Sequence, residues 1–151
     1  MRTFILLLAT AAFAQQDVGT NVRQPNVDFY DSISDYFRQS RRAVDLIAQK
    51  GMPDEEIPAV LYIARHSIAS PNQVIDARKA GKPFADIAKD YNVKLEGADF
   101  VSEANIVFLA EYHGRTPAEV RTLRGKGVTF IDINQQFRRV GTHPTKKATQ
   151  R

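Results

Sequence analysis

The chain has 151 residues and a formal net charge of +4 at pH 7, and it contains no cysteine. Without cysteine it can form no disulfide, no thiolate nucleophile and no cysteine-ligated metal site. The positive excess is mild and suits at most a weak attraction to anionic lipid, envelope polymer or nucleic acid. The length suits one domain with a modest core.

Residues 1–14 have the pattern of a secretory signal peptide. Arg2 precedes the apolar run FILLLATAAF, and Ala12 and Ala14 place small residues where a signal peptidase cuts. The alternatives are a buried helix or a membrane anchor, but the run is too short to span a bilayer. We therefore predict cleavage before Gln15, export to the periplasm or medium, and no transmembrane segment in the mature chain.

The first part of the predicted mature chain is a leader followed by one helix. Residues 15–26 are rich in Gln, Asn, Gly and Pro and are expected to be flexible. The apolar residues of 27–50 recur at spacings of three, four and seven, which predicts one amphipathic helix ending before Gly51. They are Phe29, Ile33, Tyr36, Phe37, Val44 and Ile47.

An internal repeat follows, with an offset of 46 residues. Residues 60–93 align with residues 106–139 without a gap, and eight of the 34 positions are identical. A repeat of this length is typical of stacked supersecondary units. We predict an all-α domain over 27–140, with two three-helix units packed face to face around one core.

Each unit reads as three helices joined by short turns. The first helices are expected at 56–68 and 102–113, with Ser102 as a cap. The second begin after Ser70 and Thr116 and end at Gly81 and Gly127, and the third carry Phe84 and Phe130. The segment GVTFIDI is rich in β-branched residues and permits a strand, but its copy GKPFADI favours a helix. Residues 141–151 are predicted to form a disordered basic tail.

Residues 70–93 resemble the first two helices of a trihelical helix-turn-helix domain. The pattern is SPxxVxxxRxxGxxFxxIAxxYxV, and the resemblance implies nucleic-acid binding. Such a domain needs a third, basic recognition helix, whereas Val93 is followed by the acidic and then apolar KLEGADFVSEANIVFLA. Nucleic-acid binding is therefore the second alternative function, and no specific DNA partner is predicted.

Asp86 and Asp132 are the weak candidates for catalysis, together with His113. The aspartates are repeat equivalents, and paired carboxylates can act as general acid and base. The structural interpretation is stronger, because Thr129 and Asp132 have the spacing of a capping box and acids favour a helix N-terminus. The alternative function is accordingly an envelope hydrolase or lyase with these residues in a groove between the units.

Arg78 and Arg124 are the weak candidates for ligand binding. Both fall near the ends of their helices, where a cation is favoured, and each can reach the aspartate of its own unit across the glycine turn. The histidines His66, His113 and His143 have no metal-ligand spacing. No metal and no cofactor are predicted.

The run GMPDEEIPAVLYIARHS, together with the repeated PxxVxxxRxxGxxFxDI, resembles uncharacterised exported bacterial proteins. The resemblance covers residues 51–93 and, more weakly, 102–137. It implies export and an all-helical fold, and no activity. The function predicted is a non-enzymatic binding or interaction module, with an envelope protein or an anionic envelope polymer as its partner.

Overall fold

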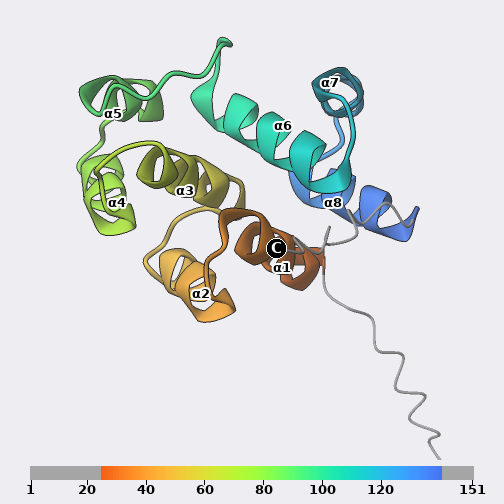
Figure 1. Cartoon of the computed structure of the whole chain (residues 1–151), viewed down its shortest axis with the longest axis horizontal. Helices are drawn as coiled ribbons and strands as arrows, with labels where there is room; N and C mark the ends of the chain where they lie inside the picture. Colours follow the sequence, from red (N-terminus) through yellow and green to blue (C-terminus); the bar gives the residue numbers. More distant parts are fainter. Residues whose placement is uncertain (1–24, 141–151) are drawn as a thin grey trace, which may run out of the picture.

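A computed structural model describes residues 25–140. Within that range the chain forms eight α-helices, one short 3₁₀ helix and no strand (Figure 1). The predicted all-α class is therefore confirmed. The predicted signal peptide, nearly all of the leader and the basic tail lie outside the described residues.

The predicted single helix over 27–50 is wrong, because two helices occupy this region. Helix α1 runs over Pro25–Phe37 and α2 over Arg41–Gln49. Arg38 adopts a left-handed φ of 55°, and the Ser40 side chain accepts a hydrogen bond from the Ala43 N–H. That cap satisfies a backbone donor of α2 and makes the break favourable. The leader prediction also fails at its end, since α1 begins inside 15–26.

The next three helices follow in short succession. The 3₁₀ helix η1 (Asp54–Glu56) leads into α3 (Ile57–Arg65), α4 (Pro71–Lys79) and α5 (Phe84–Asp90). Ser70 and Gln73 form a complete capping box at the start of α4. Gly81, with a φ of 91°, provides the predicted turn before α5, because a left-handed φ suits glycine.

The last three helices are α6 (Phe100–His113), α7 (Pro117–Gly125) and α8 (Phe130–Arg139). Thr116 and Glu119 form the capping box of α7, and the segment GVTFIDI is helical as predicted. The prediction of Ser102 as a cap is wrong. The cap is Asp99, whose side chain accepts a hydrogen bond from the Ser102 N–H.

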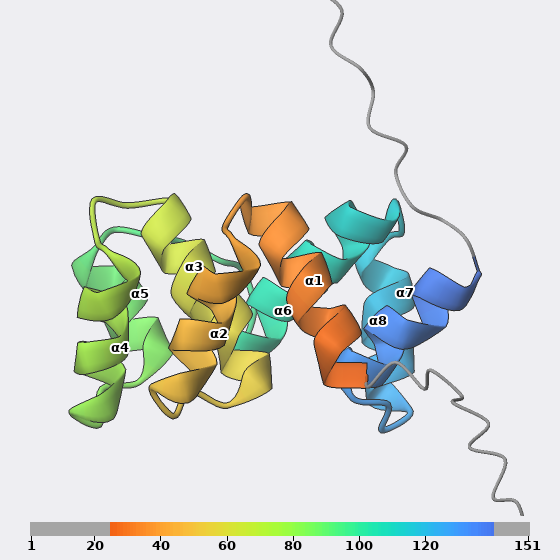
Figure 2. The ribbon, with the colours of Figure 1, turned by 90° about the horizontal axis from the view of Figure 1, so that it is seen from below.

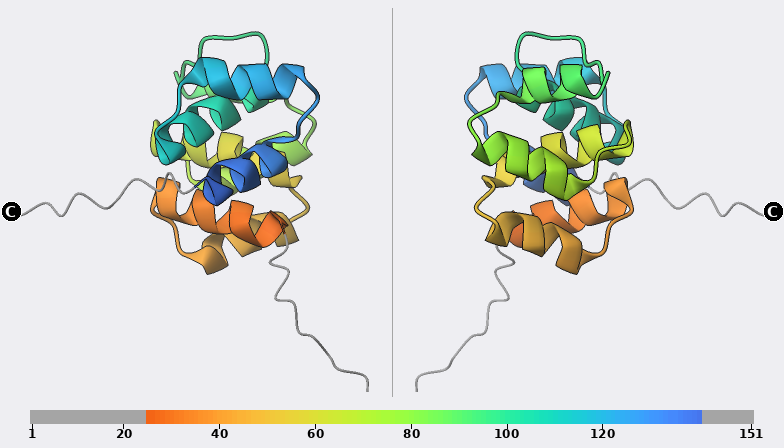
Figure 3. Two further views of the ribbon diagram at one scale, coloured as in Figure 1. Left: turned by 90° about the vertical axis from the view of Figure 1, so that its right-hand side faces the viewer. Right: turned by 90° about the vertical axis from the view of Figure 1, so that its left-hand side faces the viewer.

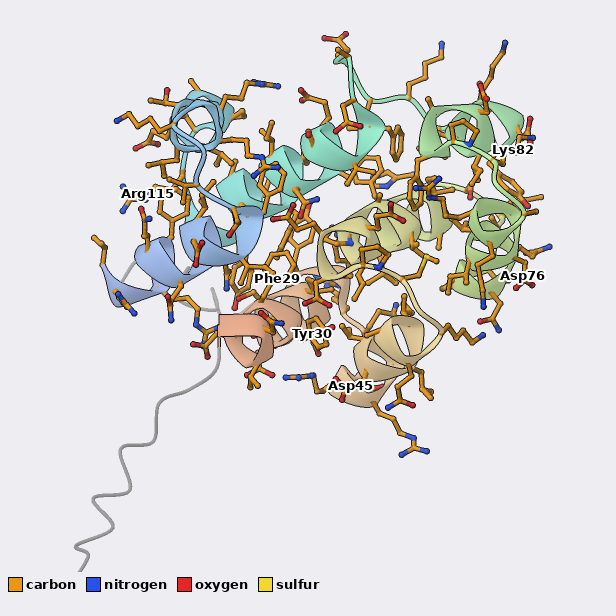
Figure 4. All side chains as sticks on the ribbon, turned by 180° about the vertical axis from the view of Figure 1, so that it is seen from behind. Phe29, Tyr30, Asp45, Asp76, Lys82 and Arg115 are labelled. Atoms are coloured by element: carbon orange, nitrogen blue, oxygen red, sulfur yellow. The ribbon has the colours of Figure 1, made fainter. Side chains whose placement is uncertain are left out.

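The helices lie in three rows. Helices α5, α6 and α7 form one outer row, α4, α3 and α8 the middle row, and α2 and α1 the other outer row (Figures 1 and 3). Figure 2 shows α4 and α5 at one end of the molecule and α7 and α8 at the other. Phe29 lies in the middle, with its ring 5.8 Å from that of Phe108 (Figure 4). None of the described helices is long and apolar enough to cross a membrane.

Helix α1 packs against α8, which joins the two ends of the described chain. The Arg138 guanidinium donates hydrogen bonds to the Ser32 hydroxyl and the Asp28 carbonyl, at 3.0 and 3.3 Å. Arg138 therefore belongs to this helix contact and not to the basic end of the chain. Five of the 21 Lys and Arg residues and one of the 17 acids lie outside 25–140, so the described domain is formally neutral.

Candidate functional site

The three catalytic candidates are not brought together. Asp86 lies in the first turn of α5 and Asp132 in the first turn of α8, and these helices lie at opposite ends of the molecule (Figure 2). His113, the last residue of α6, is 1% exposed, and its Nε2 lies 2.9 Å from the Asn134 Oδ1. None of the cavities described below is lined by these three residues.

Asp132 takes part in the helix capping that its spacing predicts. Its backbone N–H donates to the Thr129 hydroxyl at 3.1 Å, and that hydroxyl donates to the Asp132 carboxylate at 2.7 Å. Asp86 has only the corresponding backbone contact, to the Pro83 carbonyl. Both aspartates are exposed. Their contacts are those of helix N-termini and not of an acid–base pair.

Arg78 and Arg124 each lie over the phenylalanine ring six residues later in the sequence. The guanidinium carbons are 5.2 Å from the ring centre of Phe84 and 4.8 Å from that of Phe130. A guanidinium over an aromatic face is attracted by the ring quadrupole. These contacts hold the start of α5 against the end of α4, and the start of α8 against the end of α7.

The acidic partners of both arginines come from η1. Arg78 donates two hydrogen bonds to the Glu56 carboxylate, at 2.8 and 3.1 Å, and the Glu56 contact raises the pKa of Arg78 further. Arg124 lies 3.8 Å from Glu55. The predicted pairing of each arginine with the aspartate of its own unit is therefore replaced by pairing with these glutamates.

No three His, Asp or Glu side chains of residues 25–140 gather in a group that could hold a metal ion. His66 is exposed, stacks on Tyr62 and lies 2.9 Å from the Tyr62 carbonyl through its Nδ1. The described part of the chain thus offers no built metal centre.

The helix-turn-helix resemblance ends after α5. A connection without helix, residues 91–99, separates α5 from α6. Helix α6 then lies in the core, with buried residues on several sides. A recognition helix must present a polar face to the major groove, so α6 does not fit that role.

A hollow lined by residues of α2, α3 and the start of α4 is the first candidate site; Figure 1 shows where these helices lie. We call it the α2–α4 groove. It consists of two adjoining hollows of about 270 and 210 Å³ that share Gln39, Leu61 and Pro71. The other lining residues are Phe37, Ala43, Leu46, Ile47, Lys50, Ala64, Arg65, Ala69 and Asn72.

Leu46 is the most conspicuous residue of this groove, because its side chain is 44% exposed. Beside it Ile47 and Leu61 are buried and form an apolar floor. Lys50 donates a 2.5 Å hydrogen bond to the Asn72 side chain, and Arg65 lies over the Tyr36 ring at 5.2 Å. Each of the two hollows therefore combines apolar side chains with one cation, Lys50 in the first and Arg65 in the second.

The second candidate site is a larger hollow beside α5, which we call the α5–α6 cavity. It has a volume of about 430 Å³ and lies between α5, the connection 91–99 and the start of α6. Its lining residues are Ala85, Ala88, Lys89, Asn92, Val93, Lys94, Leu95, Glu96, Gly97, Ala98 and Phe100.

Sequence reasoning missed both hollows. The spacing of apolar residues predicts that Leu46 lies in a helix. It does not predict that no other described helix covers Leu46. A visible signal was the order Arg42, Leu46, Lys50, which places an apolar residue between two cations along one helix face.

Residues 25–140 form an all-α fold, with the α2–α4 groove and the α5–α6 cavity on its surface. Comparisons with protein-family models, with curated proteins and with solved structures gave no match. The function is therefore argued from the geometry alone.

Proposed function

We propose that this protein is a non-enzymatic binding module whose α2–α4 groove takes an apolar, acid-flanked segment of a partner protein. The observation that carries the proposal is Leu46, an exposed leucine set over a buried apolar floor. Fully burying a leucine stabilises a complex by about 1.5–3 kcal/mol. A partner that covers Leu46 recovers part of that free energy.

The charges around the groove favour an acidic partner. Arg42 and Lys50 lie one helical turn on either side of Leu46, and Arg65 lines the other hollow. Among the described residues no carboxylate forms an ion pair with these three cations. Carboxylates flanking an apolar segment would complement them and would orient the segment along the groove.

Binding is favoured over catalysis by the positions of the candidate residues. Asp132 and its cap partner hold the start of α8, and His113 is buried against Asn134. Neither lies at the α2–α4 groove. The polar side chains that do line the groove, Gln39, Lys50, Arg65 and Asn72, include no histidine and no carboxylate.

A labelled 15-residue amphipathic peptide provides the test. Its leucines recur at spacings of three and four residues. Two versions are compared, one flanked by glutamates and one flanked by lysines. We expect the glutamate peptide to bind the protein at least tenfold more tightly than the lysine peptide, as measured by fluorescence anisotropy. Amide shifts should concentrate on α2, α3 and α4.

Two variants locate the site. Leu46→Gln should weaken the glutamate peptide about fivefold, since roughly 1 kcal/mol of burial is lost. Val140→Gln is the matched control, because Val140 is also exposed but lies at the end of α8, away from the groove. Equal binding of both peptides, or equal effects of both substitutions, would overturn the proposal.

We also propose that two three-helix segments, α3–α5 and α6–α8, are structural repeats of each other. Helices α4 and α7 begin 46 residues apart, as do α5 and α8. The capping boxes and the arginine–phenylalanine contacts recur in both segments. The common offset and the common contacts support the repeat.

Exchange of one turn tests the repeat. Replacing residues 79–83 by residues 125–129 keeps arginine, glycine and phenylalanine in register. The exchange should cost only about 1–2 kcal/mol of unfolding free energy, mostly from the glycine placed at position 79. Adding Gly81→Val should destabilise further, because a β-branched residue is strained at a φ of 91°. Unfolding of the exchanged chain itself would contradict the repeat.

Export remains part of the proposal. It rests on Arg2, the apolar run 4–13 and the small residues Ala12 and Ala14. Protein recovered from the envelope fraction or the medium should begin at Gln15 on N-terminal sequencing. Recovery of an intact chain with Met1 in the cytoplasm would overturn the proposed localisation.

A further inference from the structure

The α5–α6 cavity is a second site, independent of the α2–α4 groove. Its volume of about 430 Å³ lies within the range of about 300–1,000 Å³ that is usual for small-molecule pockets. Helix α5 contributes Ala85 and Ala88 to the lining, and the connection and the start of α6 contribute Leu95 and Phe100. These small and larger apolar residues leave an apolar slot.

The slot continues past the cavity. An adjoining hollow of about 210 Å³ shares Ala85, Ala98 and Phe100 with it and extends to Phe84, where Arg78 also lines it and lies over the Phe84 ring. At its far end the Asp99 carboxylate already accepts hydrogen bonds from the Ser102 N–H and hydroxyl, at 3.0 and 2.5 Å. An extended apolar chain thus has more room than the cavity alone provides.

The rim of the cavity is cationic. Lys89 and Lys94 both line it and are exposed. The neighbouring Asp90 carboxylate already pairs with Lys82, which lies on the outside of the α4–α5 end (Figure 4). Within residues 25–140 neither rim lysine forms an ion pair with an acid. Glu96 is the one acid among the lining residues, so their net charge is positive.

We propose that the α5–α6 cavity binds a small amphiphile with one negative end, such as a medium-chain carboxylate. The carboxylate lies between Lys89 and Lys94, and the aliphatic chain follows the apolar slot past Ala85 towards Phe84. The apolar slot supplies most of the affinity, and the lysines select the anion over neutral and cationic molecules of the same length.

The test compares decanoate with decanol and decyltrimethylammonium, which share the chain and differ in the charge of the head group. The full chain is titrated below the micelle concentration of each probe and followed by amide shifts and calorimetry. We expect decanoate to bind about tenfold more tightly than either other probe, with shifts in α5, residues 91–99 and the start of α6. Butyrate, which cannot fill the slot, should bind at least tenfold more weakly than decanoate.

Matched variants separate the two parts of the site. Lys89→Gln with Lys94→Gln should weaken decanoate about tenfold, since each surface ion pair contributes modestly, whereas Lys79→Gln with Lys126→Gln should change nothing. Ala85→Leu narrows the slot from an exposed position and should abolish binding. Ala118→Leu, also exposed but on α7, is its control.

The results can contradict the proposal in four ways. Absence of decanoate binding up to its solubility limit would overturn it. Equal binding of decanoate and decanol, unaffected by the lysine substitutions, would overturn the assignment of the anion. Shifts confined to α2 and α3 would place the amphiphile in the α2–α4 groove instead. Binding to anionic vesicles without binding of monomeric decanoate would identify a membrane surface, and not this cavity, as the target.

Discussion

Neighbouring glutamates hold the two three-helix segments in different ways. Both carboxylate oxygens of Glu56 accept hydrogen bonds from Arg78, at 2.8 and 3.1 Å. Glu55 accepts a 2.8 Å hydrogen bond from the Phe130 N–H and lies 3.8 Å from Arg124. Both arginines therefore pair with a glutamate of η1, Arg78 through two hydrogen bonds and Arg124 through a longer contact to a glutamate that also accepts from the start of α8. Similar sequence fixes the local turn, and the tertiary neighbours decide which polar contact completes it.

The largest expected effects come from the phenylalanines, where the two segments should be most alike. Phe84 and Phe130 are 4% and 1% exposed. Phe84→Ala and Phe130→Ala should each lower the free energy of unfolding by about 3–5 kcal/mol, through lost burial and a cavity, out of a total of roughly 5–15 kcal/mol.

Urea unfolding of both variants provides the measurement. Phe84→Leu and Phe130→Leu are the controls and should recover most of the loss, because they restore apolar volume. A difference above about 2 kcal/mol between the two alanine variants would break the equivalence of the segments.

Substitutions of Glu56 and Glu55 should lower the free energy of unfolding by different amounts. Glu56→Gln loses the charge in a two-bond contact and should cost about 1 kcal/mol, a value discounted because Arg78 is one third exposed. Glu55→Gln should cost less, about 0.5 kcal/mol, because its amide oxygen still accepts from the Phe130 N–H.

A double-mutant cycle is the sharper measurement. The coupling between Glu56 and Arg78 should be about 1 kcal/mol, and that between Glu55 and Arg124 close to zero. Equal couplings would show that the difference in distance has no energetic consequence.

The aspartates should also behave differently, although their sequence positions are equivalent. Asp132→Ala removes the carboxylate that Thr129 contacts and should cost about 0.5–1 kcal/mol. Asp86→Ala should cost only a few tenths of a kcal/mol, about the helix-dipole contribution, because Pro83 offers no side-chain cap. Thermal unfolding of both variants measures this, and Asp132→Asn, which keeps an acceptor, is the control. Equal losses would contradict it.

The smallest expected effect is on the free energy of unfolding at acidic pH, where the capping boxes of α4 and α7 should differ. Hydrogen bonds from the Thr116 backbone and hydroxyl lower the pKa of Glu119, whereas Gln73 in the other box does not titrate. The stability that Glu119 contributes is fully present above its unfolded pKa of about 4.3. It is lost as the pH falls through the lower folded pKa.

Glu119→Gln should therefore reduce the loss of stability between pH 5 and pH 3, and Gln73→Glu should increase it. Both effects are followed by urea unfolding at several pH values. No change in the pH dependence of either variant would show that the boxes contribute nothing through titration.

The features that sequence predicted well are local. The capping residues Ser70, Thr116 and Thr129 and the turns at Gly81 and Gly127 each depend on a few neighbouring residues. A serine or threonine before a first-turn proline predicts the start of a helix. A glycine that can adopt a positive φ predicts its end. These positions could therefore be assigned without knowing the fold.

The features that sequence missed depend on packing between distant residues. The break before Ser40 was hidden because Phe37 and Val44 are seven residues apart and both buried, as they would be in one continuous helix. The partners of Arg78 and Arg124 lie 22 and 69 residues earlier, so no local spacing identifies them. The groove at Leu46 exists only because no other described helix covers that face of α2.

The contact between α1 and α8 has a consequence for synthesis of the chain. Arg138 contacts Asp28 across 110 residues, so a nascent chain cannot complete its domain until α8 has left the ribosome. Until then Asp28 and Ser32 of α1 lack their contact with Arg138. Contacts of such long sequence separation slow folding. The unfinished domain therefore stays open to chaperones until α8 has been synthesised.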